Sequence, residues 1–77
     1  MPALTSRQVA IYAFIINFLQ DHGWPPTIRE ISEAFDMRSP NGVVYHLKAL
    51  RQKGVIDMAP YARGIRLKQY RIRLEPV

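Results

Sequence analysis

The sequence predicts a small, mainly α-helical domain in which three helices precede a short β-hairpin. Two observations predict it: three helix-start signals within the first 40 residues, and alternating apolar side chains across residues 55–67. A chain of 77 residues has the length of one domain. We expect residues 1–67 to form this domain and residues 68–77 to be a basic C-terminal tail.

The first helix is expected to begin after Thr5, because Thr5 and Gln8 have the spacing of a capping box. Gly23 and the prolines after it should end the helix. Val9 and Ile16 lie beyond its core face, so its apolar surface is wider than one small core needs. The core face itself has helical spacing and consists of Ile11, Phe14, Ile15, Phe18 and Leu19.

The second helix is short and starts with another capping box, formed by Thr27 and Glu30. It should end near Phe35, with Asp36 in a tight turn that needs a left-handed backbone. Its predicted apolar stripe consists of Ile28, Ile31, Ala34 and Phe35.

The third helix is expected to start at Ser39 and Pro40, which suit the N-cap and the first helical position. It should run to about Gln52, and Gly54 follows its end. Residues 28–52 therefore read as a helix-turn-helix, and the hairpin at residues 55–67 makes the predicted fold a winged helix-turn-helix. The apolar residues that alternate in this hairpin are Ile56, Met58, Ile65 and Leu67.

Two faces are expected on the third helix, because successive residues are rotated by about 100°. Val43, Leu47 and Leu50 form the face for the core. The opposite side suits the major groove of DNA, where the first half of such a helix reaches base edges. That side holds Asn41, which can pair with adenine, Val44, which can meet a thymine methyl group, and Tyr45, Lys48 and Gln52.

Positive charge is concentrated in one part of the sequence. Residues 1–36 hold two arginines against four carboxylates, whereas residues 37–73 hold nine basic side chains against Asp57 alone. This asymmetry favours a polyanionic partner such as nucleic acid, and a solvated basic surface is the alternative. Arg63, in the hairpin loop, is expected to touch the DNA backbone or minor groove.

Each of these residues also has a purely structural interpretation. Ser39 is an N-cap whether or not its hydroxyl and the amides at the helix start also hold a phosphate. Asn41 and Lys48 can be solvated surface residues, and Tyr45 can cover the edge of the core. The tail alternates Tyr70, Ile72 and Leu74 with polar residues, which fits a strand, a dimerisation arm or a frayed end.

Six segments of the chain resemble the N-terminal DNA-binding domain of the LexA repressor family. The resemblance covers residues 2–67 and implies a winged helix-turn-helix that represses transcription by binding operator DNA, usually as a homodimer. The matching segments are ALTSRQ (3–8), GWPPTIREI (23–31), RSPN (38–41), HLKAL (46–50), KGVI (53–56) and RGIRL (63–67).

The resemblance also implies roles for individual residues. It places Arg7 and Lys53 near the DNA backbone. It places the following residues at the DNA: Ser39, Asn41, Gly42, Val44 and Tyr45.

Several residues depart from the family pattern. The best-known member has two acidic residues where this chain has Val44 and Tyr45, so the operator sequence is expected to differ. Where the family has a basic residue directly after Thr27, this chain has Ile28. Arg29, the next residue, is the candidate for the corresponding DNA contact. Asp36 stands where the family usually has a glycine in the turn between the second and third helices. The family's second domain carries a serine-lysine self-cleaving peptidase and most of the dimer contact; the sequence stops before it, so we expect no self-cleavage.

The expected partner is double-stranded operator DNA. The chain itself is expected to form a weak homodimer, or to be a monomer that pairs only on DNA. We expect no membrane, cofactor, metal or small-molecule substrate, and a cytoplasmic, nucleoid-associated location. The leading alternative is a winged-helix adaptor that binds an acidic protein. An enzyme is less favoured, because no paired carboxylates, metal cluster or nucleophile–base set is evident in the sequence.

Overall fold

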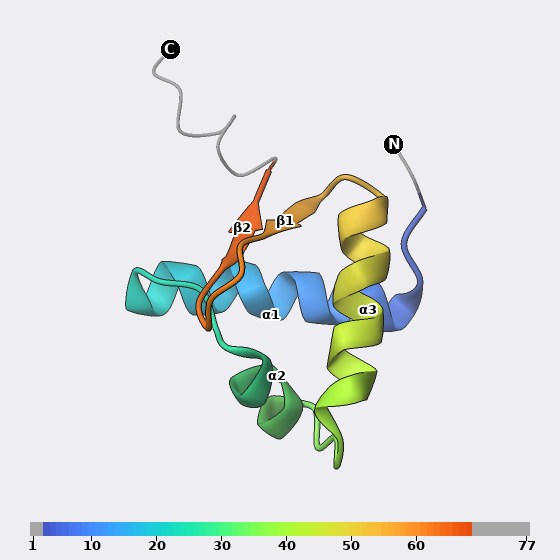
Figure 1. Cartoon of the computed structure of the whole chain (residues 1–77), viewed down its shortest axis with the longest axis horizontal. Helices are drawn as coiled ribbons and strands as arrows, with labels where there is room; N and C mark the ends of the chain where they lie inside the picture. Colours follow the sequence, from blue (N-terminus) through green and yellow to red (C-terminus); the bar gives the residue numbers. More distant parts are fainter. Residues whose placement is uncertain (1–2, 69–77) are drawn as a thin grey trace.

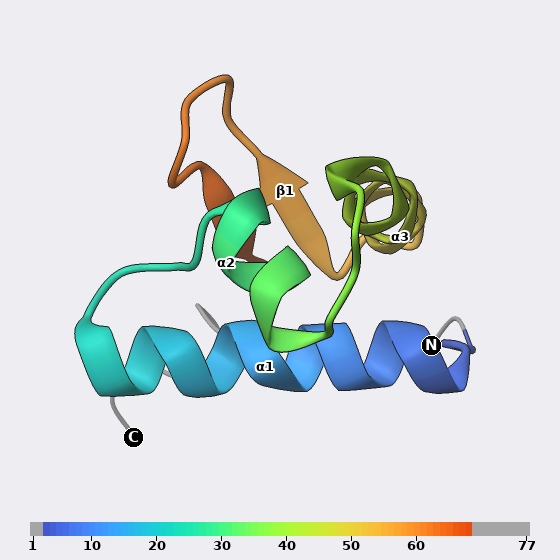
Figure 2. The ribbon, with the colours of Figure 1, turned by 90° about the horizontal axis from the view of Figure 1, so that it is seen from below.

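The longest element, α1 (Ser6–His22), supports the rest of the fold, which is described for residues 3–68 by a computed structural model. Next come α2 (Ile28–Ala34), α3 (Pro40–Gln52), β1 (Ile56–Met58) and β2 (Ile65–Leu67). Figure 1 shows α3 crossing in front of α1, and Figure 2 shows α2, α3 and the hairpin on one side of α1. The predicted three helices and antiparallel hairpin are thus confirmed.

Local capping explains where the helices begin. Thr5 and Gln8 form the predicted capping box of α1, and Thr27 and Glu30 form that of α2. Ser39 caps α3, as predicted. In each case a side-chain oxygen accepts a hydrogen bond from a backbone N–H that has no partner within the helix.

The helix ends and the inter-helix turn depend on left-handed backbone conformations. Gly23 caps α1 at φ 83°, and Gly54 follows α3 at φ 79°. Asp36 lies in the turn between α2 and α3 at φ 55°, as predicted for this position. Among residues 3–68 it is the only non-glycine residue with positive φ. Asp tolerates the left-handed backbone region better than most residues.

One apolar core joins all the elements. Ile11 and Ile15 of α1 are fully buried in it, together with Ile31 of α2. Ala34 was predicted to share the apolar stripe of α2 but is exposed, because the buried face of α2 is centred between Ile31 and Ser32 and Ala34 lies on the other side of Ile31. The other core residues are Val43, Leu47, Leu50, Val55, Ile56, Ile65 and Leu67.

The hairpin has the predicted pairing pattern over a short length. Ile56 pairs with Leu67 and Met58 with Ile65, so these side chains share one face, while Asp57 opposite Arg66 lies on the other. The predicted tail interpretations concern residues 69–77, which lie outside the described residues. Between residues 3 and 68, no helix is long and apolar enough to cross a membrane.

Candidate nucleic-acid interface

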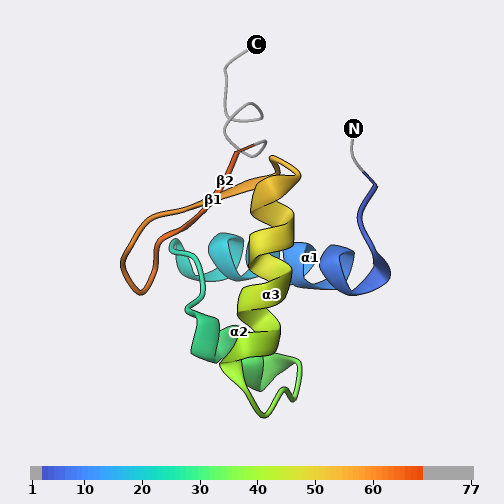
Figure 3. The ribbon, with the colours of Figure 1, turned by 45° about the vertical axis from the view of Figure 1, so that its right-hand side comes forward.

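The third helix presents one face to the core and another to solvent. Val43, Leu47 and Leu50 are completely buried, and burying a side chain of this size stabilises a fold by about 1.5–3 kcal/mol. This burial fixes the rotation of α3 about its axis and thereby determines which residues face outward. Figure 3 shows α3 at the front of the molecule, with α1 behind it.

The outward side of α3 holds the residues predicted to meet bases. Asn41, Tyr45 and Lys48 are exposed, and Tyr45 has 70% of its surface accessible. Val44 and Gly42 are half-buried. A Cβ added to Gly42 would meet one side-chain atom within 4 Å, at an ordinary contact distance of 3.5 Å, so packing does not require glycine there.

The start of α3 combines a helix cap with free donors. Ser39 Oγ accepts a hydrogen bond from the Asn41 backbone N–H at 3.2 Å. A serine hydroxyl that accepts one bond still has its own proton to donate. Ser39 and Pro40 are both exposed, so an anion can approach this helix end, where the backbone N–H groups and the helix dipole favour negative charge.

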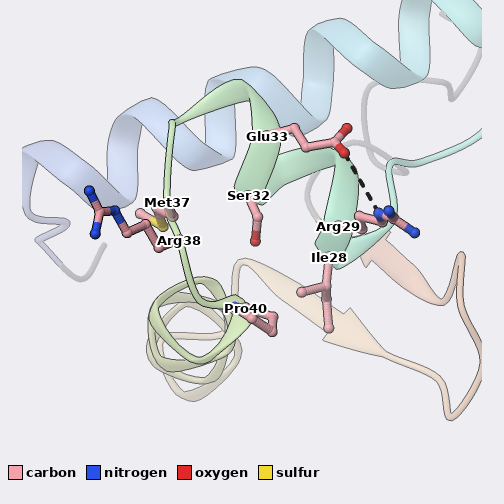
Figure 4. A pocket seen from close by; sticks show the side chains of 7 residues that line it. All are labelled: Ile28, Arg29, Ser32, Glu33, Met37, Arg38 and Pro40. Atoms are coloured by element: carbon pink, nitrogen blue, oxygen red, sulfur yellow. Dashed lines mark ion pairs between the residues drawn. The ribbon is translucent and has the colours of Figure 1, made fainter.

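A hollow of about 540 Å³ separates α2 from the start of α3 (Figure 4). Arg29 and Arg38 lie at opposite ends of it, and the Ser32 side chain points into it. The Ser32 hydroxyl oxygen is buried without a hydrogen-bond partner among the described residues. The remaining lining residues are Ile28, Glu33, Met37 and Pro40.

Arg38 did not appear among the site residues expected from the sequence. Its side chain is exposed, and no ion pair involves it within residues 3–68. Its position directly before the Ser39–Pro40 helix start was the sequence signal that could have identified it, because a phosphate at that helix end comes close to the preceding residue.

Arg7 and Arg29, two of the predicted backbone contacts, already have partners within the protein. The Arg7 guanidinium lies 5.6 Å from the ring centroid of Phe35. Arg29 forms an exposed ion pair with Glu33 at 3.6 Å, in the i, i+4 geometry that contributes little to stability. These two arginines remain accessible from solvent.

Lys53 is held more closely. Its Nζ donates to the backbone carbonyl of Ala3 and to Oε1 of Gln8, both at 2.7 Å. An ammonium group has three donors, so one remains for an outside acceptor. Lys53 thus fastens the beginning of the chain to the end of α3.

Arg63, predicted to face DNA, is turned inward and half-buried. Its two terminal nitrogens donate to the Glu30 carboxylate, each at 2.9 Å, and one of them also donates to the Pro25 carbonyl at 2.8 Å. The sequence interpretation did not include these partners. Contact between Arg63 and DNA stays a prediction, and the guanidinium has a different role in the free protein.

Glu30 is consequently surrounded by donors. Hydrogen bonds from Arg63, and then the bond from the Thr27 backbone N–H, lower the pKa of Glu30 to about 2. The same pairing raises the pKa of Arg63. Both groups are therefore charged over the whole physiological pH range.

Comparison with known proteins shows which family the sequence matches. A family model described as the LexA DNA binding domain matches residues 1–64. The chain is 55% identical over 60 residues to a LexA repressor of Anaeromyxobacter dehalogenans (strain 2CP-1 / ATCC BAA-258), covering 78% of this chain and 26% of the relative. It is 52% identical over 68 residues to LexA repressors of Pseudomonas aeruginosa (strain LESB58) and Pseudomonas chlororaphis, covering 87% of this chain.

The chain spans between 26% and 34% of the length of these curated relatives. The matched region contains the three helices, β1 and the loop up to Gly64, and it ends one residue before β2. With the family model covering residues 1–64, the chain belongs to the LexA DNA-binding domain family.

Proposed function

We propose that this chain binds double-stranded operator DNA sequence-specifically, with the exposed face of α3 in the major groove, and acts as a repressor of transcription. The observation that carries the proposal is the division of α3 into a buried face and an exposed face that starts at a capped, accessible helix end. The major groove admits an α-helix and displays a distinct donor and acceptor pattern for each base pair. The repressor names of the relatives support the same function.

Base reading is assigned to the first half of α3. Asn41 can form a bidentate pair with adenine, and Val44 can contact a thymine methyl group. Tyr45 adds an exposed hydroxyl one helical turn after Asn41. Gly42, between them, has no side chain and so lets the helix backbone approach the DNA closely.

Backbone positioning is assigned to the helix start and to cations around it. Ser39 and the free N–H groups of α3 are proposed to hold one phosphate. Contacts with phosphates fix the register of a protein on the duplex but carry no sequence information. The proposed phosphate contacts are Arg7, Arg29, Arg38, Lys48 and Lys53.

A non-enzymatic regulator that needs no cofactor fits these assignments. Every proposed contact is a hydrogen bond, an ion pair or an apolar contact with DNA, and none requires a chemical step. We place this regulator in the cytoplasm, at the nucleoid, where its DNA partner would be.

The test is selection of duplexes from a random library by the wild-type chain, by Asn41→Ala and by Tyr45→Glu. Asn41→Ala should cost about 1–3 kcal/mol of discrimination at one base pair, because a bidentate base contact is lost. Stability should change little, since Ser39 still caps the helix. Tyr45→Glu should shift the preferred site, because a carboxylate accepts from cytosine N4.

Asn17→Ala is the matched control, because Asn17 is exposed on α1. It should select the same sequences as the wild type. If Asn41→Ala and Tyr45→Glu fold normally and also select wild-type sequences, the exposed face of α3 does not read DNA.

We also propose that the chain forms a weak homodimer, or a monomer that pairs only on DNA. Val9 has 50% of its surface exposed, whereas Ile16 packs against the core and is a poorer candidate. Symmetric dimers bind two half-sites spaced by about one helical turn of DNA. Sedimentation of wild type and Val9→Lys, with duplexes carrying one or two selected sites, should show weaker pairing for Val9→Lys; identical behaviour would exclude the Val9 surface.

A further inference from the structure

The loop that connects β1 and β2 is fastened to a distant part of the chain through Arg63. The guanidinium donates to Glu30 at the start of α2 and to the Pro25 carbonyl in the segment between α1 and α2. It also lies 5.9 Å from the ring centroid of Phe18 in α1. One side chain therefore contacts three separate parts of the fold.

Glu30 is fixed from the opposite side by its own helix. Its Oε1 accepts from the Thr27 backbone N–H at 2.8 Å as part of the capping box, and both carboxylate oxygens accept from Arg63. The bidentate geometry between a guanidinium and a carboxylate permits few relative orientations. The direction of the wing loop is thus defined relative to the first turn of α2.

At the loop end the last ladder pair, Met58 and Ile65, packs on the core, and beyond this pair the described hydrogen bonds from the loop to other elements come from Arg63. The hairpin ladder contains three residue pairs, and an isolated two-stranded hairpin is marginally stable in water. Within the loop, Ala59 donates to the Gly64 carbonyl at 2.8 Å and Gly64 donates to the Tyr61 carbonyl at 3.0 Å. These bonds shape the loop internally but do not connect it to α2.

We propose that Glu30 and Arg63 form a positioning pair that holds the wing at the correct angle to α3 for binding DNA. This inference rests on the proposed function. Arg63 affects DNA binding through Glu30, because a move of the guanidinium to a phosphate would leave the Glu30 carboxylate without its partner. The pair thereby links the helix-turn-helix and the wing into one rigid surface for the duplex.

Two substitutions separate positioning from direct phosphate contact. Glu30→Gln keeps the acceptor that the capping box needs but replaces one carboxylate oxygen with an amide that cannot accept from Arg63. If Arg63 touches phosphate directly, this change frees the guanidinium and affinity should be unchanged or higher. If Arg63 positions the wing, affinity should fall.

Arg63→Lys gives the second comparison. Lysine keeps the positive charge but lacks the planar fork. A direct phosphate contact would survive this change largely intact, whereas the bidentate geometry that orients the loop relative to Glu30 would be lost, since an ammonium pairs with a carboxylate without the two parallel hydrogen bonds.

The experiment measures the affinity of the full chain for a duplex selected by the wild type, across a range of salt concentrations. Arg63→Ala, Arg63→Lys and Glu30→Gln should each weaken binding by roughly three- to thirtyfold, and Glu30→Gln/Arg63→Ala should be no weaker than the worse single variant. The slope of log K against log salt should stay at the wild-type value, because no phosphate contact is lost. All variants are measured below the temperature at which any of them begins to unfold.

Asp21→Asn is the matched control, because it also removes one negative charge, Asp21 is exposed, and the ion pairs within residues 3–68 do not involve it. It should leave affinity equal or slightly higher. Wild-type affinity in Glu30→Gln, or a salt slope reduced by about 0.9 in Arg63→Ala, would overturn the positioning role alone. If the wild type selects no duplex, the proposed function fails and the positioning role fails with it.

Discussion

Among single residues, Glu30 belongs both to a helix cap and to an ion pair, and this makes the stability of the fold depend on pH. The folded-state pKa of Glu30 is about 2, against an ordinary value of 4.5. A lowered pKa in the folded state contributes stability that is present above the ordinary value and is lost as pH falls. The contribution should therefore be complete above about pH 4.5 and disappear between pH 4.5 and 2.

Melting temperatures of wild type and Glu30→Gln across that window check this expectation. The wild type should be more stable at neutral pH, and the difference between the two should shrink as pH falls toward 2. A difference that is the same at pH 3 and pH 7 would mean that the carboxylate charge does not stabilise the fold.

The residues of the site differ in how far they could be predicted. Ser39, Asn41 and Tyr45 were placed correctly as cap and exposed residues, because a helix repeats its environment every few positions and the core residues identify the other face. The internal partners of Arg63 and Lys53 were missed. Those partners lie 33 to 50 positions away in the sequence, and local patterns carry no information about such pairs.

Among the elements, the wing depends on a glycine for steric reasons. A Cβ added to Gly64 would collide with the carbonyl oxygen of Ala59 and lie 2.9 Å from that of Tyr61. Both neighbours are backbone atoms, so relief requires the loop itself to move. Gly64→Ala should destabilise the protein by about 1–3 kcal/mol through overpacking.

Gly42→Ala is the matched control for this prediction, because its added Cβ meets a side-chain atom at 3.5 Å. It should be neutral or stabilise α3 by about 0.5–1 kcal/mol, since glycine is a poor helix former. Urea denaturation of both variants gives the comparison. Equal stability of Gly64→Ala and wild type would show that the loop can rearrange without cost.

The order and type of the elements followed from local chemistry, whereas their relative placement did not. Capping boxes at Thr5 and Thr27, the Ser39–Pro40 start and the alternation in the hairpin each act within a few residues. The exposure of Ala34 was mispredicted, because the buried face of α2 is turned toward Ser32, a polar residue that is not part of the apolar pattern. Apolar periodicity alone does not indicate that a serine lies on the buried face.

For the whole molecule, charge should control binding to DNA. Residues 37–68 hold seven basic side chains against Asp57, and α3 and the hairpin lie in this part of the chain. Each neutralised phosphate releases counterions, so the slope of log K against log salt should be about −0.9 per contact. Binding titrations of a selected duplex from low to physiological salt measure it.

A flat salt dependence would contradict the DNA-binding face. Salt-sensitive binding to an acidic protein without measurable affinity for duplex DNA would favour the adaptor alternative. The two partners can be compared under the same conditions, because both would compete for the same basic surface.

The link from Lys53 to Ala3 and Gln8 has a consequence for the order in which the protein folds. Contacts across 50 and 45 positions close most of the described chain into a loop, and closing a loop costs entropy that helix formation within one segment does not. The start of the chain should therefore be fastened after the helices have formed. In stopped-flow refolding, a fluorescent label at Ala3 should report docking later than the circular dichroism signal of the helices; simultaneous signals would contradict this order.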